Sequence, residues 1–351
     1  MTAQSSVAVG AAGQTPATAT VPATGQATGA VLRKGRFLNP DGSRAGQHPR
    51  NVLRLFREGF GPPWPPVTAA VIRSEAPPAP LPGHVAVTFV GHSTFLLRFH
   101  NGPTLLTDPV WSDRCSPFRF AGPKRVRPPG LALDALPPLD AVLLSHNHYD
   151  HMDLATLRRL MPVRVVTGLG NGRYLARKGL PGAEELDWWQ HTTLPDGTRL
   201  TYLPARHFSA RTPFDAGRML WGGFAVHTPG GGSLYFAGDT AYGSHLREIG
   251  DRVGPFDVGL LPIGAYDPRW FMEVVHTDPA EAVRMHRDLR VRTGVAMHFG
   301  TFKLTREAID APVLGLEAAR AAAGIPPERF LVPEFGGTLM LPLGGASASA
   351  D

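Results

Sequence analysis

Histidine and aspartate are concentrated in one short segment of the sequence, Ser145-His146-Asn147-His148-Tyr149-Asp150-His151. An apolar run directly before it predicts a buried strand and the apolar spacing behind it predicts a helix, so the segment forms a strand-to-helix loop. Residues two apart on an extended backbone point to the same side, so His146 and His148 can share one metal ion. The turn carries Asp150 and His151 toward a second ion. The alternative is a surface loop that is rich in histidine by chance, but the HxHxDH pattern behind a strand favours two adjacent ions.

Three later segments place further candidate ligands directly after predicted strands. His207, Asp239 and His298 follow the strands at 201–203, 233–237 and 294–297. Strand ends converge on one edge of a sheet, so these side chains can meet the first cluster although they are far away in sequence. We assign His146, His148 and His207 to one ion, Asp150, His151 and His298 to the other, and Asp239 as the bridge. A bound water or hydroxide completes an open, catalytic arrangement.

Composition and charge narrow the class of protein. The chain has 351 residues, of which 43% are hydrophobic, so it can build one large domain. The formal net charge of +6 suits an anionic substrate or a membrane surface, but lysine and arginine are scattered, and we expect no nucleic-acid partner. The single cysteine, Cys115, excludes an internal disulfide, and the candidate site lacks cysteine, which leaves nitrogen and oxygen ligands. We expect Cys115, His92 and His286 to be structural.

Low-complexity sequence at both ends divides the chain into four parts. Residues 1–31 are predicted to be a disordered tail, residues 32–82 an N-terminal extension, residues 83–343 the main domain with the candidate site, and residues 344–351 a flexible tail. No stretch of about 18 uncharged apolar residues predicts a membrane span, and an export signal is not evident at the start. We therefore predict a cytoplasmic protein, either soluble or peripheral at a membrane, and leave open whether it forms a homodimer.

A short amphipathic element lies in the N-terminal extension. Residues 51–60 place apolar side chains at roughly helical spacing, and a proline-rich segment closes the element. Packing on the main domain is the simpler interpretation. The alternative is an apolar lip for a lipid substrate or a bilayer interface, with Phe56 and Trp64 as its large side chains.

The main domain begins with strands in quick succession. Apolar runs at 85–90, 94–99 and 104–107 predict an antiparallel meander, and Asn101-Gly102 predicts a two-residue hairpin turn. A long loop from 111 to 138 then leads to the strand before residues 145–151, the metal segment. Loops of that length are often functional.

The candidate ligands, with the Ala-Gly-Asp-Thr around Asp239, resemble the metallo-β-lactamase superfamily. The resemblance implies an α+β fold, a four-layer αββα sandwich with a dinuclear metal site at one edge. Longer motifs are similar to the N-acylphosphatidylethanolamine-hydrolysing phospholipase D group of this superfamily: GPKR at 122–125, LDWW at 186–189, PIGAYDPRWFM at 262–272, HTDP at 276–279 and HFGTF at 298–302. The similarity runs from about residue 35 to about residue 340.

This resemblance implies a zinc-dependent hydrolase with two Zn²⁺ per chain, although histidine and carboxylate ligands also accept iron or manganese. The implied activity is of phospholipase D type: a metal-bound hydroxide hydrolyses N-acylphosphatidylethanolamine-like phospholipids to N-acylethanolamine and phosphatidic acid. A soluble hydrolase for another phosphodiester or a sugar-phosphate lactone is the alternative that the same ligands allow. Two departures from the group, Val275 before His276 and Phe208-Ser209-Ala210 after His207, concern the substrate and leave the metal ligands intact.

Charge and spacing indicate how a substrate is bound and cleaved. Two divalent ions, two carboxylate ligands and a hydroxide leave about one positive charge, which favours a phosphodiester anion. Beside the bridging Asp239, His276 is the second candidate catalytic residue, because it stands just before a predicted helix start and can position the phosphate or protonate the leaving oxygen. A structural histidine is the alternative. Tyr149 either hydrogen-bonds the substrate or packs as a wall, and Lys124 and Arg125 either bind an anionic head group or are only solvated.

Overall fold

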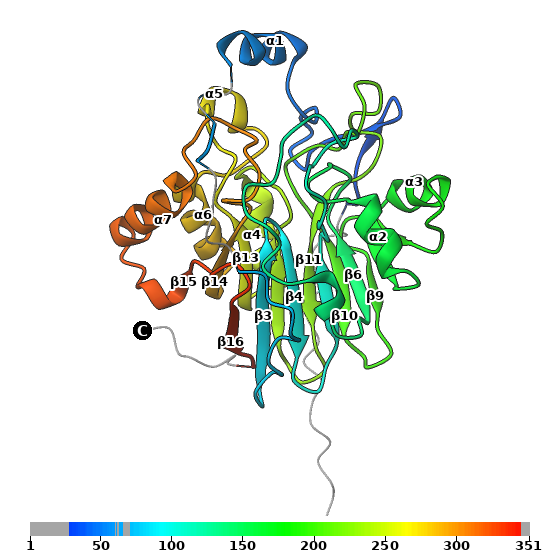
Figure 1. Ribbon diagram of the computed structural model, residues 1–351, viewed down its shortest axis with the longest axis vertical. Helices are drawn as coiled ribbons and strands as arrows, with labels where there is room; N and C mark the ends of the chain where they lie inside the picture. Colours follow the sequence, from blue (N-terminus) through cyan, green and yellow to red (C-terminus); the bar gives the residue numbers. More distant parts are fainter. Residues whose placement is uncertain (1–27, 60, 62, 66–70, 345–351) are drawn as a thin grey trace, which may run out of the picture.

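Two seven-stranded sheets pack face to face in the structure, a computed structural model that describes residues 28–59, 61, 63–65 and 71–344 (Figure 1). In spatial order the first sheet contains β16 (Thr338–Pro342), β3 (His84–Gly91), β4 (Thr94–Phe99), β5 (Thr104–Thr107), β6 (Ala141–Leu144), β7 (Val165–Gly168) and β8 (Glu184–Leu186). The second contains β15 (Phe330–Leu331), β14 (Val291–Met297), β13 (Phe256–Pro262), β12 (Ser233–Phe236), β11 (Gly222–His227), β10 (Arg199–Pro204) and β9 (His191–Thr193).

Both sheets follow the same plan. In the first, β16, β3, β4 and β5 pair antiparallel, and β5, β6, β7 and β8 pair parallel. In the second, β9 to β12 pair antiparallel and β12 to β15 parallel. Parallel strands need crossover segments. Most of these contain the helices that cover the sheets, whereas the crossover from β5 to β6 is the long loop before β6.

Strands of both sheets are buried on their two faces, which explains their continuous apolar runs. On β4, Phe95 and Leu97 belong to the core between the sheets. Leu96, which points the other way, packs in a second cluster with Leu157 and Leu175 from the covering helices. Full burial of such a side chain stabilises the fold by about 1.5–3 kcal/mol.

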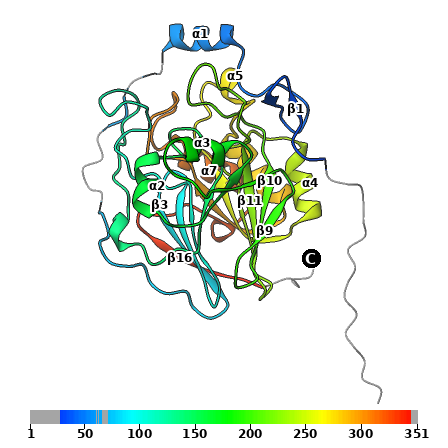
Figure 2. The ribbon, with the colours of Figure 1, turned by 90° about the vertical axis from the view of Figure 1, so that its right-hand side faces the viewer.

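Helices cover the outer faces of the two sheets (Figures 1 and 2). α2 (Leu154–Leu160) and α3 (Asn171–Arg177) lie on the first sheet. α4 (Ser244–Arg252), α6 (Pro279–Asp288) and α7 (Ala311–Ala322) lie on the side of the second, where α6 packs on β13 and β14 and α7 packs on α6. This αββα order confirms the predicted fold class.

The N-terminal extension lies against the main domain at one end of the sandwich (Figure 1). It contains β1 (Leu32–Arg33), β2 (Arg36–Phe37) and α1 (Pro49–Glu58). The backbone N–H of Phe37 donates to the carbonyl of Gly217 at 2.7 Å, which ties the extension to the loop after β10. No helix in the described ranges is long and apolar enough to cross a membrane.

Several predictions fall on parts of the chain outside the described residues. These parts include most of the two predicted tails, residues 1–27 and 345–351, and the side chain of Phe56 within α1. The order of the tails and a substrate contact by Phe56 therefore stay predictions.

The predictions from short sequence patterns were accurate for the strands and the helix starts, and one predicted turn was not. The helix start predicted just after His276 is confirmed. It carries a capping box, in which Asp278 accepts from the N–H of Glu281 and the side chain of Glu281 accepts from the N–H of Asp278. The helix after the metal segment begins at Leu154, with Asp153 as its cap. The predicted two-residue hairpin is wrong, since residues 100–103 separate β4 from β5. The N–H of Phe99 and the carbonyl of residue 103 still pair at 3.1 Å and close this longer turn.

Candidate metal centre

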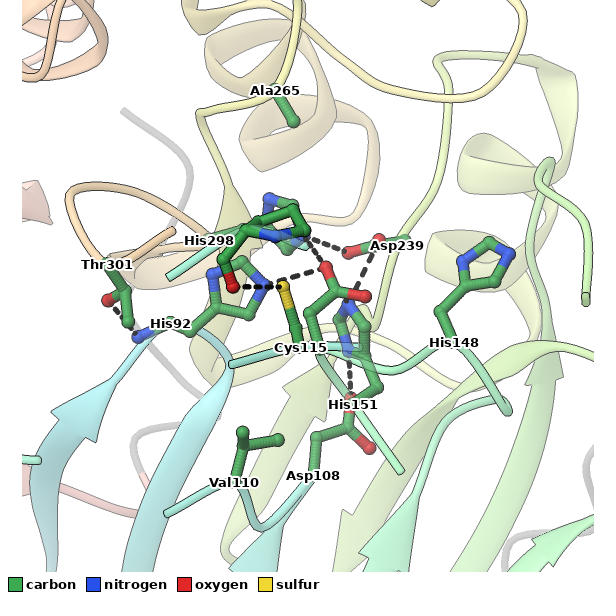
Figure 3. Close-up of polar contacts among 12 residues, drawn as sticks. His92, Asp108, Val110, Cys115, His148, His151, Asp239, Ala265, His298 and Thr301 are labelled. Atoms are coloured by element: carbon green, nitrogen blue, oxygen red, sulfur yellow. Dashed lines mark hydrogen bonds and ion pairs between the residues drawn. The ribbon is translucent and has the colours of Figure 1, made fainter. Parts of the chain in front are cut away.

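The predicted ligands lie together where strands of both sheets end. Figure 3 labels four of them, His148, His151, Asp239 and His298. His146 follows β6 of the first sheet, whereas His207, Asp239 and His298 follow β10, β12 and β14 of the second. The ligands therefore lie at an edge that both sheets share. From the sequence we expected them at the edge of a single sheet. The side chains of His146, His207, Asp239 and His298 are all buried. Because rigid buried strands fix the start of each loop, the loops deliver their side chains to one point.

The first group of donors consists of His146, His148, His207 and Asp239. Nδ1 of His148 lies 2.8 Å from Nε2 of His146 and 3.2 Å from Nε2 of His207. Oδ2 of Asp239 lies 3.9 Å from Nε2 of His146 and 3.6 Å from Nε2 of His207. Three imidazole nitrogens and a carboxylate oxygen form a donor set that suits zinc and related divalent ions.

The second group of donors contains Asp150, His151 and His298, with His92 beside them, and Asp239 also faces this group. Oδ2 of Asp239 lies 3.1 Å from Nε2 of His151, and Oδ1 lies 3.2 Å from Nε2 of His298. Oδ2 of Asp150 is 3.5 Å from each of these two nitrogens. Asp239 therefore faces both groups, which is the position that a bridging carboxylate needs.

Hydrogen bonds behind the ligands orient the histidine rings. Nδ1 of His151 donates to Oδ2 of Asp108 at 2.6 Å, and Nδ1 of His207 donates to a backbone carbonyl at 2.7 Å. Since these partners can only accept, Nδ1 carries the hydrogen and Nε2 presents its lone pair to the centre. Nδ1 of His146 lies 2.9 Å from the hydroxyl of Ser145, which itself donates to Asp108 at 2.6 Å. The same tautomer follows for His146.

Buried atoms without partners test whether these residues fit metal ions. Nε2 of His151, Nε2 of His298 and Oδ1 of Asp239 are buried and have no hydrogen-bond partner among the described residues. An unsatisfied buried polar atom costs about 1–3 kcal/mol, so each needs an explanation. Ions held between the two donor groups would satisfy all three atoms, and the residues therefore fit a dinuclear site.

Burial and charge hold most of these ligands in their metal-binding forms. Burial lowers the pKa of His148 to about 3 and that of His207 to about 4. Burial alone would raise the pKa of Asp239, but the neighbouring histidines outweigh it and lower that pKa well below its usual value. For His151 and His298 burial is in turn outweighed by the nearby carboxylates, which raise the pKa of His151 well above its usual value and that of His298 to about 9. A metal ion would displace these protons and bind neutral imidazoles and ionised carboxylates.

Comparison with known proteins decides the family. Residues 104–299, more than half of the chain, match the β-lactamase superfamily domain. The chain belongs to the metallo-β-lactamase fold superfamily. A Mycobacterium tuberculosis protein described as uncharacterized is 39% identical over 304 residues, which are 82% of this chain and 78% of that protein.

Two further relatives bear on this superfamily member. The N-acyl-phosphatidylethanolamine-hydrolyzing phospholipase D 1 of Caenorhabditis elegans is 38% identical over 231 residues, 62% of this chain and 64% of that protein. Less than two thirds of that relative is therefore spanned. The solved metallo hydrolase Igni18 of Ignicoccus hospitalis superposes with a TM-score of 0.55 at 24% identity, covering 73% of this chain and 98% of the other, which shows the fold. By their names, both of these proteins are hydrolases.

Two residues of this metallo-β-lactamase centre were not assigned to it from the sequence. His92, expected to be structural, donates from Nε2 to Oδ2 of Asp150 at 3.0 Å. Asp108 accepts from His151 and Ser145, as described above. Both stand directly after strands that end at the ligand edge, β3 and β5. The position directly after a strand, which made His207 a candidate ligand, makes His92 and Asp108 candidates for the centre as well.

Three residues of the centre have left-handed backbone conformations. φ is 57° at His92, 31° at Asp108 and 60° at His298. Residues with a Cβ rarely adopt such values, which cost about 1–3 kcal/mol each unless the surroundings fix them. Here the N–H of His298 donates to the carbonyl of His92, and the N–H of His92 donates to Oγ1 of Thr301, both at 2.9 Å (Figure 3). These bonds lock His92 and His298 to each other.

His276, the other candidate catalytic residue, is buried beside the bridging carboxylate. Its Nε2 lies 3.9 Å from Oδ2 of Asp239, and burial lowers its pKa well below the usual value. Arg269, in α5 (Arg269–Met272), donates to the carbonyl of His276 at 3.0 Å, and α6 begins just after it. The backbone of His276 is therefore fixed, and burial keeps its ring next to the two donor groups.

Tyr149 lies at the wall of the centre. Its hydroxyl donates to the carbonyl of Arg211 at 3.0 Å, and the Arg211 guanidinium lies 3.9 Å above its ring. The same guanidinium donates to the carbonyls of Asn147 and Met152, both at 2.8 Å. Arg211 thus holds the metal loop in shape, and these contacts favour the packing interpretation of Tyr149.

Other predicted substrate contacts lie in different surroundings. Arg125 is 8% exposed and donates to two loop carbonyls at 2.7 and 3.3 Å, so it organises its loop and is not presented to a head group. Lys124 beside it is exposed. Trp64 is half-buried, and its indole N–H donates to the carbonyl of Glu307 at 2.8 Å. Trp64 therefore packs on the main domain, which favours the packing interpretation of this element over the apolar lip.

Proposed function

We propose that the protein is a zinc-dependent phosphodiesterase of the phospholipase D type, which hydrolyses N-acylphosphatidylethanolamine-like phospholipids to N-acylethanolamine and phosphatidic acid. The observation that carries the proposal is the position of Asp239, whose two oxygens face both groups of metal ligands. The name of the Caenorhabditis elegans relative supports the choice of substrate.

The residues of the centre suit an anionic diester. Two divalent ions would activate water and stabilise negative charge on the phosphate. The carboxylates of Asp150 and Asp239 offset only part of the charge of two such ions, so a net positive site would attract a phosphodiester. His148 and Asp150 are less buried than the other ligands, and we infer that the substrate approaches from their side.

The leaving group defines the task of His276. Hydrolysis at phosphorus breaks the bond between phosphorus and the ethanolamine oxygen, and this oxygen must receive a proton. Nε2 of His276 is close enough to Asp239 to meet a phosphate held at the centre. From there the neutral ring can orient the phosphate. It can donate the proton only where a phosphodiester anion bound beside it raises the pKa that burial lowers.

A substrate panel tests the proposal. We expect the purified, zinc-loaded protein to release N-acylethanolamine and phosphatidic acid from N-acylphosphatidylethanolamine in a mass-spectrometric assay, and to leave phosphatidylcholine largely intact. Chelation should abolish the activity, and addition of zinc, iron or manganese should identify the metals that restore it. Turnover of bis(p-nitrophenyl) phosphate without any turnover of the phospholipid would reject the lipid substrate.

The Asp239→Asn variant is the matched control for the metal centre. We expect it to lose turnover and metal content, because a neutral amide offsets less of the repulsion between two ions. Two ions per chain and full activity in this variant would reject the bridging role.

A further inference from the structure

Exposed phenylalanine side chains lie on two loops at the metal end of the sandwich. Phe120 is 82% exposed, Phe214 is 80% exposed and Phe118 is 55% exposed. Phe118 and Phe120 belong to the loop after β5, where their rings lie 5.5 Å apart, and Phe214 belongs to the loop after β10. Both strands end at the edge that carries the ligands. Grouped exposed aromatic residues mark an interaction surface.

The backbone holds these side chains outward. Oδ1 of Asp215 accepts from the N–H groups of Arg211 and Thr212 at 3.0 and 2.8 Å, which forms a turn with Phe214 at its tip. The other loop is closed at its base, where the N–H of Cys115 donates to a carbonyl at 3.2 Å. The exposure of the rings is thus part of two ordered turns.

A basic hollow of about 750 Å³ borders both loops, since Phe118 and Arg211 are among its lining residues. Its acidic residues are Asp113 and Asp153. The carboxylate of Asp153 caps α2 and accepts from the N–H of Ser112 at 3.0 Å, so it already has hydrogen-bond partners within the protein. The basic residues in its walls are Arg114, Arg119, Arg158, Lys178 and Arg211. The hollow therefore carries net positive charge.

We propose that this end of the molecule docks on an anionic lipid surface, with Phe118, Phe120 and Phe214 entering the interface and the basic hollow facing the head groups. Aromatic loop tips suit shallow insertion, and nearby basic residues suit anionic lipids. A second copy of the chain fits less well, because a symmetric contact would bring two basic hollows together. The inference rests on the proposed function, for which it supplies the surface that delivers a phospholipid to the ligands.

Binding to vesicles without substrate tests the surface independently of catalysis. We expect the full-length, metal-loaded protein to sediment with vesicles of phosphatidylglycerol and phosphatidylcholine. The double variant Phe120→Ala/Phe214→Ala should bind about tenfold or more weakly, because two large apolar side chains no longer leave water. Arg119→Glu should weaken binding about fivefold or more on these vesicles and leave the weaker binding to pure phosphatidylcholine unchanged.

Matched controls carry the same changes elsewhere on the surface. Leu314→Ala removes a 57% exposed apolar side chain on α7, and Arg199→Glu reverses an exposed charge at the start of β10, the end away from the ligands. Both should bind vesicles like the parent. Parental binding by the double variant would overturn the proposal. A second result would also overturn it. In that case the parent does not bind vesicles but forms a dimer in light scattering, and the Phe120→Ala/Phe214→Ala variant is a monomer.

A soluble substrate separates this inference from the proposed function. All four variants should hydrolyse bis(p-nitrophenyl) phosphate at the parental rate, since none of them changes a ligand. A parent that binds vesicles and does not hydrolyse N-acylphosphatidylethanolamine would reject the substrate and leave the docking surface standing. A parent that hydrolyses the phospholipid in detergent and does not bind vesicles would reject the docking surface and leave the proposed substrate standing.

Discussion

The carboxylate of Asp108 lies 2.6 Å from Nδ1 of His151, and both side chains are fully buried. Asp108 also accepts from the N–H and the hydroxyl of Ser145 at 2.7 and 2.6 Å. One residue outside the ligand set therefore fixes a ligand ring and the first turn of the metal loop. Such carboxylate–histidine pairs orient ligands and raise their basicity.

Asp108→Asn should weaken binding of the second ion about 10- to 100-fold, because the amide keeps the size of the carboxylate and loses one acceptor. Competition with a chromophoric chelator would measure the two affinities separately. Ser145→Ala leaves His151 paired and should have a smaller effect on the second ion. It also removes the partner of Nδ1 of His146, so any loss should fall on the first ion. Equal affinities in parent and Asp108→Asn would mean that His151 is oriented by its packing alone.

His92 should position Asp150. We expect His92→Ala to lower the affinity for the second ion about tenfold or more, since Asp150 loses its donor at 3.0 Å. His92→Gln can present an N–H in a similar place and should restore most of the affinity. Absorption spectra of the cobalt-substituted variants would show whether the geometry of one ion changes. If alanine and glutamine have the same effect, the hydrogen bond is not the cause.

His276 should matter most for poor leaving groups. His276→Ala should keep both ions and lose about a hundredfold or more in turnover of N-acylphosphatidylethanolamine if the ring donates the proton. The loss on bis(p-nitrophenyl) phosphate, whose leaving group needs no proton, should be much smaller. Equal losses on both substrates would assign the ring to orientation of the phosphate, and loss of metal would make it a ligand.

His286, far from any ligand, should make stability depend on pH. Burial, followed by the nearby Arg329, lowers its pKa from 6.5 to about 4, and its ring stacks on Phe330. The unfolded chain binds the proton more readily, so the contribution is complete above about pH 6.5 and is lost as the pH falls toward 4. Between about pH 7.5 and pH 5, the free energy of unfolding measured in urea should therefore fall by about 2 kcal/mol less in His286→Leu than in the parent. Parallel losses of stability would show that the pKa of His286 is the same in the folded and the unfolded state.

The ligands could be predicted because their chemistry and their position coincide. The apolar run before His146 has no role other than a buried strand, and the same strand-to-polar transition recurs before Asp239 and His298. The strand ends then determine where the side chains meet. The same position directly after a strand makes His92 a candidate as well. A residue in a tight turn can still face the centre or the solvent, and here contacts with a distant loop decide which.

The surface residues could not be predicted from local sequence. Trp64 suited a membrane lip by its composition, but its indole finds a carbonyl 243 residues away. Arg125 suited a head group, yet backbone carbonyls of its own loop bind it. Exposure of Phe120 and Phe214 likewise follows from how the loops close. Burial of a loop residue depends on packing that no short pattern encodes.

Hydrolysis in oxygen-18 water tests the central claim most directly, because attack at phosphorus places the water oxygen in one product. With the zinc-loaded protein and N-acylphosphatidylethanolamine, we predict the heavy isotope in phosphatidic acid and none in N-acylethanolamine, with Asp239→Asn as the inactive control. Label in N-acylethanolamine, label in a free fatty acid, or turnover that survives removal of the metal would contradict a metal-dependent phospholipase D.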